Sequence, residues 1–552
     1  MENMRYIDDP LEVANLFNNH FRNAPLDTIH SIKNNDPTTL STNTNQRTMY
    51  LYPFCEQELI QLINNKIKSK RSAGPDDFPC FLVRIISHVI VRPLTYLINL
   101  SFLTGAFPEA LKLAKIIPVH KKGNKYTPNN FRPISITSVF TKIFEYCFLD
   151  RLERFIEKCK ILIPNQFGFR PNKSTTDAIL FFYDTVLQSI GKKELPIGIY
   201  CDITKAFDCA NHNLLLQKLS RYGVRGTALN WLEKFLKNRT QYVSLRHSNK
   251  GYTTNVNSDI IKLNVGTPQG SILAPILFTL FTNDVLSCIP VDATLSLYAD
   301  DTAVVVSHPD ENELRATCIL TIENLSRWFE NNLLFLNHSK TKFLQFHNYQ
   351  NTNTLDINIS VNDANLEKST TVKFLGVVLD DTLSWISHNE NLIKQLNTEC
   401  YRVRYLRYYL DVKQLRMFYF ACIESRLRYG LCLWGRSSTF NQVFVTQKRI
   451  VRCTCGANYT QPCRPIFTKL RILPLPYLYI LEVCKIIFKN KHQLPHNCDI
   501  HKYHTRNTND LRVPRGRTNV NQSSPYIIGA KIFNSLPFPL KRPTTSIRSN
   551  VI

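Results

Sequence analysis

The clearest pattern in the chain is an alternation of short apolar runs, turn residues and helical spacings through its middle part. The run IGIYCD (197–202) is apolar and rich in β-branched and aromatic residues, which predicts a buried strand. The segment LSLYADDTAVVVS (295–307) changes from apolar to polar and back, which predicts a β-hairpin with two acids at its turn. Apolar residues at helical spacing predict helices over 212–223, 227–238 and 270–286.

The pattern is different near the two ends of the chain. Apolar residues at helical spacing over 11–21 predict a short amphipathic helix. Residues 27–48 are rich in Asn, Thr and Ser and predict a linker. Residues 505–524 are polar and basic and are expected to be poorly ordered. Over its whole length the chain is 43% apolar, enough to bury a core.

Positive charge is concentrated at the C-terminal end. The whole chain of 552 residues has a net charge of +25. Its last 167 residues contain 27 Lys or Arg but only 7 Asp or Glu, so they carry +20 of that excess. This distribution predicts a polyanionic partner along the C-terminal third, with a solvated basic face as the alternative.

Composition also limits where the protein acts. The 16 cysteines are scattered without a regular spacing, which favours reduced thiols inside the cell over a secreted disulfide scaffold. No apolar run reaches the roughly 18 residues of a membrane span. The first residues lack the features of a secretory signal. We therefore expect an intracellular protein, nuclear or cytoplasmic, that is neither secreted nor in a membrane.

Three carboxylates are the strongest candidates for chemistry. Asp300 and Asp301 occupy the predicted hairpin turn, and Asp202 ends the predicted strand before it. If both strands belong to one sheet, the three acids converge at its edge, where like charges repel unless cations neutralise them. Mg²⁺ prefers such oxygen ligands, and two ions roughly 4 Å apart can catalyse phosphoryl chemistry.

These residues lie in motifs that resemble those of reverse transcriptases, in the form found in non-LTR (LINE-like, jockey-type) retrotransposons. Tyr298-Ala299-Asp300-Asp301 is similar to the central motif of the family. The other similar motifs follow the family's order: IIPVHKKGN (116–124), FRPISITSVFTKIFE (131–145), NQFGFRPNKSTTDA (165–178), CDITKAFDCANHNLLL (201–216), GTPQGSILAP (266–275), NHSKTKF (337–343) and KFLGVVLDDTLSW (373–385).

The resemblance implies an α+β, right-hand polymerase with fingers, palm and a helical thumb, followed by a basic C-terminal extension. The implied segments are a connecting segment and polar linker (1–50), fingers and palm (51–379), the thumb (380–480) and a partly disordered extension (481–552). The implied activity is RNA-directed DNA polymerisation. Its partners would be dNTPs, an RNA template, a DNA primer and their RNA–DNA hybrid.

The resemblance also implies a role for single residues. Asp202 and Asp300 would bind two Mg²⁺ ions, or Mn²⁺, with support from Asp301 and the backbone carbonyl of Ile203. Lys340 would protonate the departing pyrophosphate.

Other residues would bind the nucleotide and the primer. Phe207 would exclude a 2′-hydroxyl and so select deoxynucleotides. The remaining nucleotide contacts would come from Gln269, Gly270, Arg170 and Arg132. The primer end would be held by Phe374, Leu375 and Gly376, whereas His212 is expected to be structural.

The basic C-terminal third fits a thumb that holds a hybrid through its phosphates. The segment YRVRYLRYYL (401–410) interleaves Arg with Tyr. On a helix it would present Arg402, Arg404 and Arg407 near rings that either stack on bases or pack in the core.

Two alternatives to an active reverse transcriptase remain open. The first is a decayed or co-opted copy that binds RNA without polymerising. Relatives usually carry an endonuclease domain before the polymerase, and we expect that half to be missing here. Asp77 and Cys201 also depart from the family pattern beside functional motifs. The intact Asp202, Asp300, Asp301 and Gln269 argue against decay. The second alternative is an RNA-dependent RNA polymerase, which the aromatic Phe207 disfavours.

Overall fold

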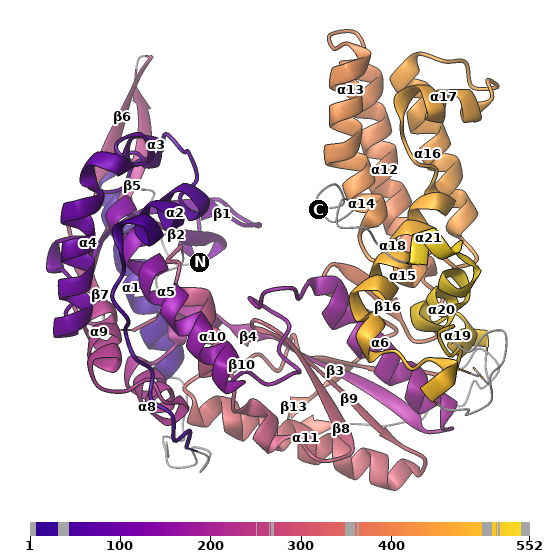
Figure 1. The fold of residues 1–552 in the computed structure, drawn as a ribbon, viewed down its shortest axis with the longest axis horizontal. Helices are drawn as coiled ribbons and strands as arrows, with labels where there is room; N and C mark the ends of the chain where they lie inside the picture. Colours follow the sequence, from indigo (N-terminus) through magenta and orange to yellow (C-terminus); the bar gives the residue numbers. More distant parts are fainter. Residues whose placement is uncertain are drawn as a thin grey trace.

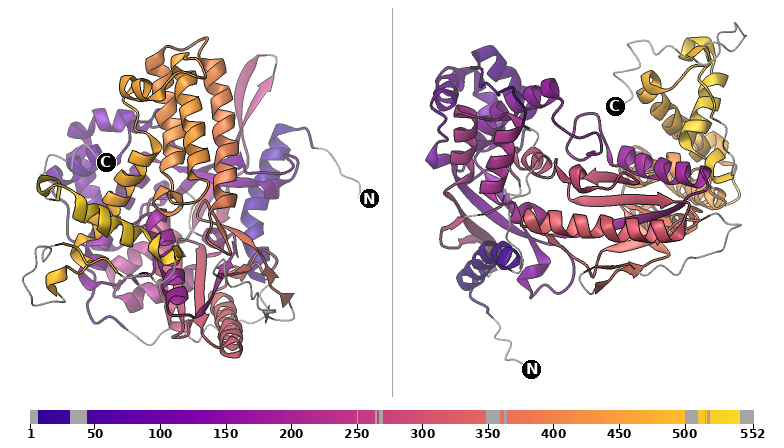
Figure 2. Two further views of the ribbon diagram at one scale, coloured as in Figure 1. Left: turned by 90° about the vertical axis from the view of Figure 1, so that its right-hand side faces the viewer. Right: turned by 90° about the horizontal axis from the view of Figure 1, so that it is seen from below.

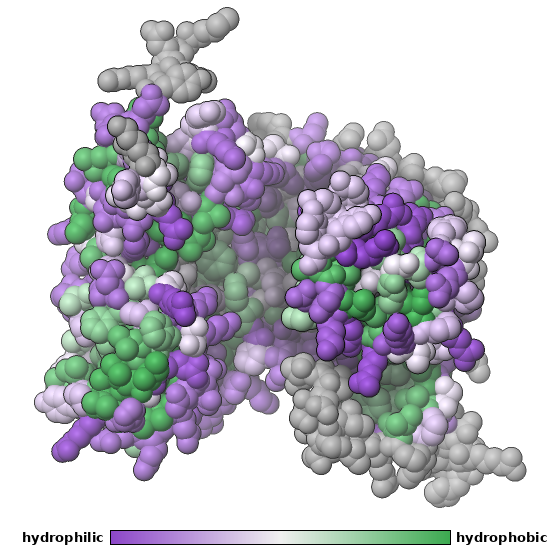
Figure 3. Space-filling model, turned by 90° about the horizontal axis from the view of Figure 1, so that it is seen from above, coloured by the Kyte–Doolittle hydropathy of each residue, from purple (hydrophilic) through white to green (hydrophobic). Residues whose placement is uncertain are grey.

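The computed structural model describes residues 7–30, 44–249, 251–263, 265–266, 270–347, 359–361, 364–499, 510–514, 516 and 519–541. Two lobes rise from a shared base (Figure 1). The space-filling view shows a hollow between the lobes (Figure 3). We name the N-terminal lobe the fingers (residues 7–163 and 205–288), the base the palm (164–204 and 289–385) and the C-terminal lobe the thumb (386–541). The expected right-hand fold class is confirmed.

The palm is built on a five-stranded sheet with the order β14-β11-β3-β9-β8. Its neighbouring strands are antiparallel, except β14 and β11, which are parallel. The bounds are β3 (Leu195–Cys201), β8 (Ala293–Tyr298), β9 (Asp301–His308), β11 (Lys342–Gln345) and β14 (Glu367–Lys368). Three two-stranded ladders adjoin it: β4 (Ile203–Thr204) with β10 (Phe335–Leu336), β12 (Ser360–Val361) with β13 (Ala364–Asn365), and β15 (Thr371–Phe374) with β16 (Val377–Asp380).

Helices cover both faces of the palm sheet, which explains why β3 is an almost continuous apolar run. Ile197 and Ile199 are buried in the core that includes residues of α11 (Glu311–Asn331). Tyr200 belongs to a second core, shared with α6 (Thr175–Gly191) and the thumb. Figure 2 shows α11 lying across the underside of the sheet. The predicted strand and the predicted hairpin are both confirmed.

The fingers contain a second sheet with the order β2-β1-β5-β6, in which β7 also pairs with β5. β1 and β2 form an antiparallel hairpin, whereas β1 and β5 are parallel. The bounds are β1 (Leu113–His120), β2 (Phe131–Thr137), β5 (Arg239–Asn249), β6 (Tyr252–Asn257) and β7 (Ile261–Leu263). Near the end of the β1–β2 hairpin, Val119 lies opposite Arg132 and His120 opposite Phe131.

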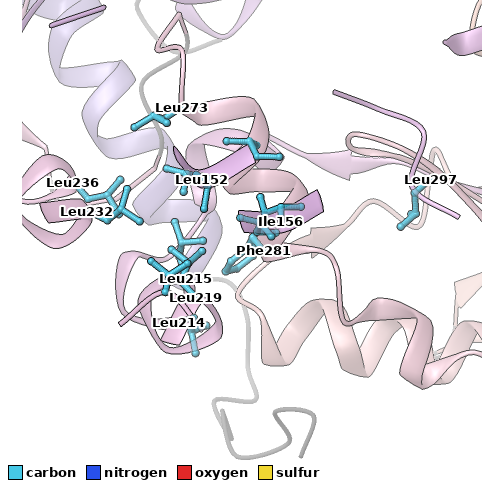
Figure 4. Close-up of a cluster of buried hydrophobic side chains, with 14 of the residues drawn as sticks. Leu152, Ile156, Leu214, Leu215, Leu219, Leu232, Leu236, Leu273, Phe281 and Leu297 are labelled. Carbon is cyan, nitrogen blue, oxygen red and sulfur yellow. The ribbon is translucent and has the colours of Figure 1, made fainter. Parts of the chain in front are cut away.

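The helices of the fingers pack on one another in a large core that continues under the palm sheet (Figure 4). Trp231 is fully buried, stacks on Phe148 at 4.3 Å between ring centroids, and donates its indole N–H to Ser101 Oγ at 2.8 Å. The helices are α1 (Pro10–His30), α2 (Glu56–Lys66), α3 (Cys80–Ile85), α4 (Ser87–Thr104), α5 (Val139–Cys159), α7 (Ala206–Cys209), α8 (His212–Tyr222), α9 (Thr227–Leu236) and α10 (Ala274–Phe281), with 3₁₀ turns η1 (Glu109–Leu111), η2 (Pro128–Asn130) and η3 (Val285–Cys288).

The thumb is helical, as expected. Its long helices α12 (Ile386–Leu406) and α16 (Phe440–Cys455) pack along each other, and α12 and α13 stand on the side that faces the fingers (Figure 1). The other elements are α13 (Val412–Phe418), the π-helical η4 (Tyr419–Glu424), α14 (Ser425–Arg428), α15 (Leu431–Trp434), α17 (Cys463–Leu470), α18 (Leu475–Asn490), η5 (Lys491–Gln493), η6 (Asn497–Asp499), α19 (Asn519–Gln522), α20 (Pro525–Ser535) and α21 (Phe538–Lys541).

Two expected segments differ in length from the structure. The helix expected over 11–21 is α1, which continues to His30 and includes the start of the predicted linker, because it packs on β5 and α7. The helix expected over 270–286 begins only at Ala274, and 3₁₀ turn η3 follows it. Asn283 interrupts this helix, because its side chain bonds the backbone of residues 161 and 163.

The described part of the basic extension packs on the thumb. The expected boundary at residue 480 falls inside α18, and α20 lies against that helix. A Cβ on Gly529 would lie 2.4 Å from Ile487, so the two helices approach closely. Much of the polar stretch expected over 505–524 lies outside the described residues. Among the helices that are described, none is both long and apolar enough to cross a bilayer.

Candidate active site

Strand register brings the three predicted carboxylates together. Cys201 at the end of β3 lies opposite Thr302 in β9, so Asp202 and Asp301 occupy neighbouring positions at the same edge of the sheet. Tyr298 pairs with Asp301 across the β8–β9 hairpin, which places Asp300 in its two-residue turn. In Figure 1 this edge lies beside β4, at the base between the two lobes. Strand register thus brings the three acids to one edge of the sheet.

A buried glutamine holds this turn. Ala299 has a φ of +59°, a strained value for a residue with a side chain. Gln166 is 1% exposed, and its Oε1 accepts hydrogen bonds from the backbone N–H groups of Gly168 and Ala299 at 2.8 and 3.2 Å. A Cβ on Gly168 would lie 2.3 Å from the nitrogen of Ala299. The motif over 165–178 thus supplies the side chain that fixes the backbone of the acidic turn.

Two of the three acids have raised pKa values. Desolvation raises the pKa of Asp300, and the charge of Asp202 raises it further. Desolvation also raises the pKa of Asp301 to about 6, with the charges of Asp300 and Asp202 adding to the shift. The fold therefore holds Asp300 and Asp301 where their ionised forms are unfavourable without cations.

Two cations approach from the fingers hairpin. Lys121 and Arg132 each lower the pKa of Asp300 through their charge. Desolvation lowers the pKa of Lys121, and the nearby charge of Arg132 lowers it further. Arg132 was predicted from the sequence, whereas Lys121 was not, although Lys121 directly follows β1 in the motif over 116–124. The register of the hairpin is what indicates Lys121, because it brings the side chains of Lys121 and Arg132 to one end of β1 and β2.

Lys340 lies beside the first carboxylate. Its Nζ is 3.5 Å from Oδ2 of Asp202, and both side chains are largely exposed, at 66% and 48%. The β4–β10 ladder sets this contact, because Leu336 pairs with Ile203 and the N–H of Asn337 donates to the backbone oxygen of Asp202. The structure thus places Lys340 and Ile203 next to the acidic cluster.

The donor set fits hard divalent cations. Carboxylate oxygens with raised pKa values and a neighbouring backbone carbonyl are the ligands that Mg²⁺ prefers. In the described residues, however, no group of three or more Asp, Glu, His or Cys side chains is already arranged around a metal position.

Phe207 lies on a short helix that follows the first carboxylate. It occupies α7 and is half-buried, with its ring stacked on Phe278 of α10 at 4.3 Å. Phe169 meets it edge-on at 6.0 Å. Next to α7, His212 is bonded to the backbone oxygen of Gly266 at 2.8 Å, which supports its expected structural role. The ring of Phe207 is thus held from two sides.

The glutamine-glycine motif is described only in part. Gln269 lies outside the described residues. Gly270 has a φ of +119°, and a Cβ there would lie 2.4 Å from the oxygen of Ser135, so only glycine fits.

A buried acid that sequence reasoning missed anchors the residues after Gly270. Oε2 of Glu145 accepts hydrogen bonds from Ser271 Oγ at 2.6 Å and from the N–H groups of Ile272 and Leu273 at 2.5 and 3.1 Å. Burial raises the pKa of Glu145, which is fully buried. This anchor ties the fingers helix α5 to the start of α10.

Arg170 has a different immediate role from the one expected. Its guanidinium donates to the backbone oxygens of Ile163 and Gln166 at 2.8 and 3.2 Å. These bonds stabilise the loop that holds Gln166. A contact of Arg170 with phosphate stays a prediction, and Lys121 and Arg132 are the cations placed beside the carboxylates.

The predicted primer grip is the β15–β16 turn. Leu375 and Gly376 form a two-residue turn with φ values of +44° and +89°, whereas Phe374 is buried against Phe182. Tyr429 of the thumb donates its hydroxyl hydrogen to the backbone oxygen of Leu375. Sequence reasoning missed this link, because it joins positions 54 residues apart.

Aromatic and basic side chains of the thumb are exposed near the end of α12. Tyr401 and Tyr405 are 71% and 58% exposed, so the stacking alternative fits them better than core packing. Arg402 pairs with the buried Glu399 at 2.9 Å. The helix ends at Leu406, so Arg407 caps it rather than continuing it.

Comparison with known proteins relates the central region to one family. Residues 119–379 match the family model described as reverse transcriptase (RNA-dependent DNA polymerase). The match covers the fingers hairpin, the acidic turn and the β15–β16 turn.

The similar curated proteins are insect polymerases. The probable RNA-directed DNA polymerase from transposon BS of Drosophila melanogaster is 28% identical over 437 residues, which cover 75% of this chain and 46% of that protein. The RNA-directed DNA polymerase from mobile element jockey of the same species is 29% identical over 421 residues, or 74% of this chain and 44% of that protein. The chain thus spans somewhat under half the length of these relatives.

Among solved structures, apo telomerase from Candida Tropicalis, truncated from its C-terminal domain, overlaps 53% of this chain and 59% of that chain. The TM-score is 0.34 and the sequence identity is 14%. The fold assignment therefore rests on the family model and on the observed arrangement of strands.

The raised pKa of Asp301 predicts a stability effect. Its folded pKa of about 6 exceeds the reference value of 3.8, so its ionisation destabilises the metal-free fold progressively as pH rises through this window. Asp301→Asn should therefore raise the melting temperature at pH 7.5 in EDTA, and the gain should shrink at pH 5.

Thermal unfolding of both proteins at the two pH values measures this effect. Asp292→Asn, at an exposed position outside the cluster, serves as the matched control and should show no such pH-dependent gain. A melting temperature that Asp301→Asn leaves unchanged at pH 7.5 would contradict the prediction.

Proposed function

Because residues 119–379 match the reverse transcriptase family model, we propose that this protein is the RNA-directed DNA polymerase of a non-LTR retrotransposon. It adds dNTPs to a primer 3′-hydroxyl on an RNA template. The observation that carries the proposal is the strand register that sets Asp202 beside Asp300 and Asp301, while Lys121 and Arg132 approach from the fingers. Carboxylates that can bind metal ions and basic side chains that can bind phosphate lie at one place. This arrangement suits nucleotidyl transfer, which depends on positioning and charge.

The acidic cluster is the proposed metal site. Asp202 and Asp300, with the backbone carbonyl of Ile203 and support from Asp301, would hold two Mg²⁺ ions, and Mn²⁺ suits the same oxygen donors. Bound there, the ions would activate the primer hydroxyl and stabilise charge on the leaving oxygen. The raised pKa values of Asp300 and Asp301 support this role, because bound cations would compensate for the lost hydration and for the repulsion that together raise them.

Basic side chains would handle the triphosphate. Lys121 and Arg132 lie opposite the carboxylates and would bind its oxygens, with Arg132 suited to a bidentate contact. Lys340, already beside Asp202, is placed to give a proton to the departing pyrophosphate. Gly270 would leave room for the incoming nucleotide near the position of Gln269.

Phe207 would choose the sugar. Its ring follows Asp202 by five residues and is braced by Phe278 and Phe169, so it has little freedom to move aside. A 2′-hydroxyl that met this ring would lose its hydrogen bonds to water and gain none in return. Deoxynucleotides are therefore the preferred substrate.

The thumb and the β15–β16 turn would hold the nucleic acids. Exposed Tyr401 and Tyr405, with Arg402 and Arg404 between them, suit the backbone and bases of an RNA–DNA hybrid. Leu375 and Gly376 would position the primer end. We expect the template to be an element's own transcript. Because this RNA and the dNTPs are found inside the cell, the proposed reaction would take place there, in the nucleus or cytoplasm.

Loss of one metal-binding carboxylate should abolish polymerisation. Asp300→Asn should reduce extension of a DNA primer on an RNA template at least about 100-fold, because each such ligand supports several kcal/mol of transition-state stabilisation. Purified wild-type and variant proteins are compared with dNTPs, with and without Mg²⁺, and Asp310→Asn is the control outside the site. Equal extension by wild type and Asp300→Asn would overturn the assignment, and RNA binding without extension by either would favour the binding-only copy.

The sugar preference should depend on the ring of Phe207. Phe207→Ala should raise the ratio of kcat/KM for rNTPs to that for dNTPs by at least about tenfold, because the excluded space opens. Phe207→Tyr keeps the ring and is the matched control. Single-nucleotide addition with each substrate gives the ratio. A wild-type enzyme that already prefers rNTPs would point to an RNA-dependent RNA polymerase instead.

The Tyr429 hydroxyl should act through the primer end alone. Tyr429→Phe removes one hydrogen bond to Leu375, worth about 1 kcal/mol, and keeps the packing of the ring. We expect a several-fold higher KM for primer–template with kcat and the KM for dNTP nearly unchanged. A fall in kcat alone, or a matching loss from the distant Tyr459→Phe, would show that the bond does not position the primer grip.

A further inference from the structure

Two cysteine thiols face each other across the contact between α12 and α16 of the thumb. The Sγ atoms of Cys400 and Cys453 are 3.8 Å apart, although the residues are separated by 53 positions in sequence. Cys400 is 3% exposed and belongs to the thumb core, whereas Cys453 is half-buried. A disulfide needs the two sulfurs to approach to roughly 2 Å, a shift that side-chain rotation and a small helix movement can supply.

Positive charge surrounds this pair. Arg404 follows Cys400 by one helical turn on α12 and interacts with the sulfur of Cys453. Arg407 approaches the end of α16, where a Cβ on Gly456 would lie 3.6 Å from its Nη1. The thiol of Cys400 and these two arginines lower the pKa of Cys453 to about 5, against the opposing effect of burial. The proton stays on Cys400, whose pKa is raised.

We propose that Cys400 and Cys453 form a redox-active dithiol site, at which hydroperoxides generate a disulfide between α12 and α16. The geometry that carries this inference is the close pair of sulfurs, one buried and one reachable, beside exposed arginines. Cys455, two residues further along the same helix, provides a contrast, because burial raises its pKa. Cys453 is therefore the nucleophile of the pair and Cys400 the resolving thiol.

The chemistry balances with a hydroperoxide as the only oxidant. The Cys453 thiolate attacks the terminal peroxide oxygen, the O–O bond breaks, and hydroxide or alkoxide leaves and takes up a proton from solvent. The resulting sulfenic acid is then attacked by the sulfur of Cys400, which forms the S–S bond. The Cys400 proton and the sulfenic hydroxyl depart as water. Two thiols are oxidised by two electrons, and a thiol reductant reverses the change.

The site has a direct consequence for the thumb. α12 carries the exposed tyrosines and arginines that we assign to the hybrid, an assignment that rests on the proposed function. A disulfide would tie that helix to α16 and would remove the negative charge that an ionised Cys453 presents to Arg404. The site itself requires no polymerase activity, so it can be tested separately.

The test uses the full-length protein treated with hydrogen peroxide and digested without reductant. We expect mass spectrometry to find a disulfide joining the peptides of Cys400 and Cys453, and dithiothreitol to remove it. Cys400→Ser should instead accumulate a sulfenic acid on Cys453 that dimedone traps, and Cys453→Ser should give neither product. Cys455→Ser is the matched control and should form the same disulfide as wild type. Absence of the disulfide in wild type, under conditions that oxidise other thiols, would overturn the proposal.

Alkylation provides a second readout, which does not depend on the disulfide. At pH 6, iodoacetamide should label Cys453 at least about tenfold faster than Cys455, because only the thiolate reacts. Arg404→Gln should slow the labelling of Cys453 several-fold and leave Cys455 unchanged. Equal labelling of the two cysteines in the folded wild type would sink the assignment of Cys453 as the nucleophile, and circular dichroism of each variant confirms that it is folded.

Discussion

The register between β3 and β9 is the constraint on which the rest of the site depends. It places Asp202, Asp300 and Asp301 at one edge of the palm sheet, where desolvation and neighbouring negative charge raise the pKa values of Asp300 and Asp301. A fold selected for stability alone would separate such charges or bury them in ion pairs. The cluster instead faces Lys121 and Arg132 of the fingers. The palm therefore holds an electrostatic strain that cations and a phosphorylated ligand would relieve.

Polar side chains from remote parts of the chain hold the irregular segments around this cluster. Gln166 fixes the acidic turn, Glu145 fixes the backbone that follows Gly270, and Tyr429 fixes the β15–β16 turn. Each of these segments departs from regular secondary structure, so its backbone groups need partners from elsewhere in the fold. A single side chain that accepts or donates these hydrogen bonds holds the loop in one conformation. The three groups also tie fingers, palm and thumb to the same site.

Much of the fold was predictable, because its signals are local. The apolar run of β3, the hairpin of β8 and β9, and the helix that ends before Gly223 are each specified by neighbouring residues. The family motifs located the carboxylates and Lys340. Lys121, Glu145 and Gln166 escaped notice for one physical reason: each acts on a partner that is distant in sequence, and the residue type alone does not reveal that partner. The sequence pattern predicted a helix from residue 270, but α10 begins only at Ala274. The reason is again a distant partner, because Glu145 accepts hydrogen bonds from the backbone N–H groups just before the helix.

The sequence by itself determined the class of this protein, because the ordered motifs and their strand and helix patterns are properties of short segments. It also predicted residues for the binding of metal, phosphate and sugar. Only the tertiary structure decided which cations face the acids, which buried groups hold the loops, and that Cys400 meets Cys453. These contacts depend on strand register and helix packing between remote segments, which the folded chain alone establishes.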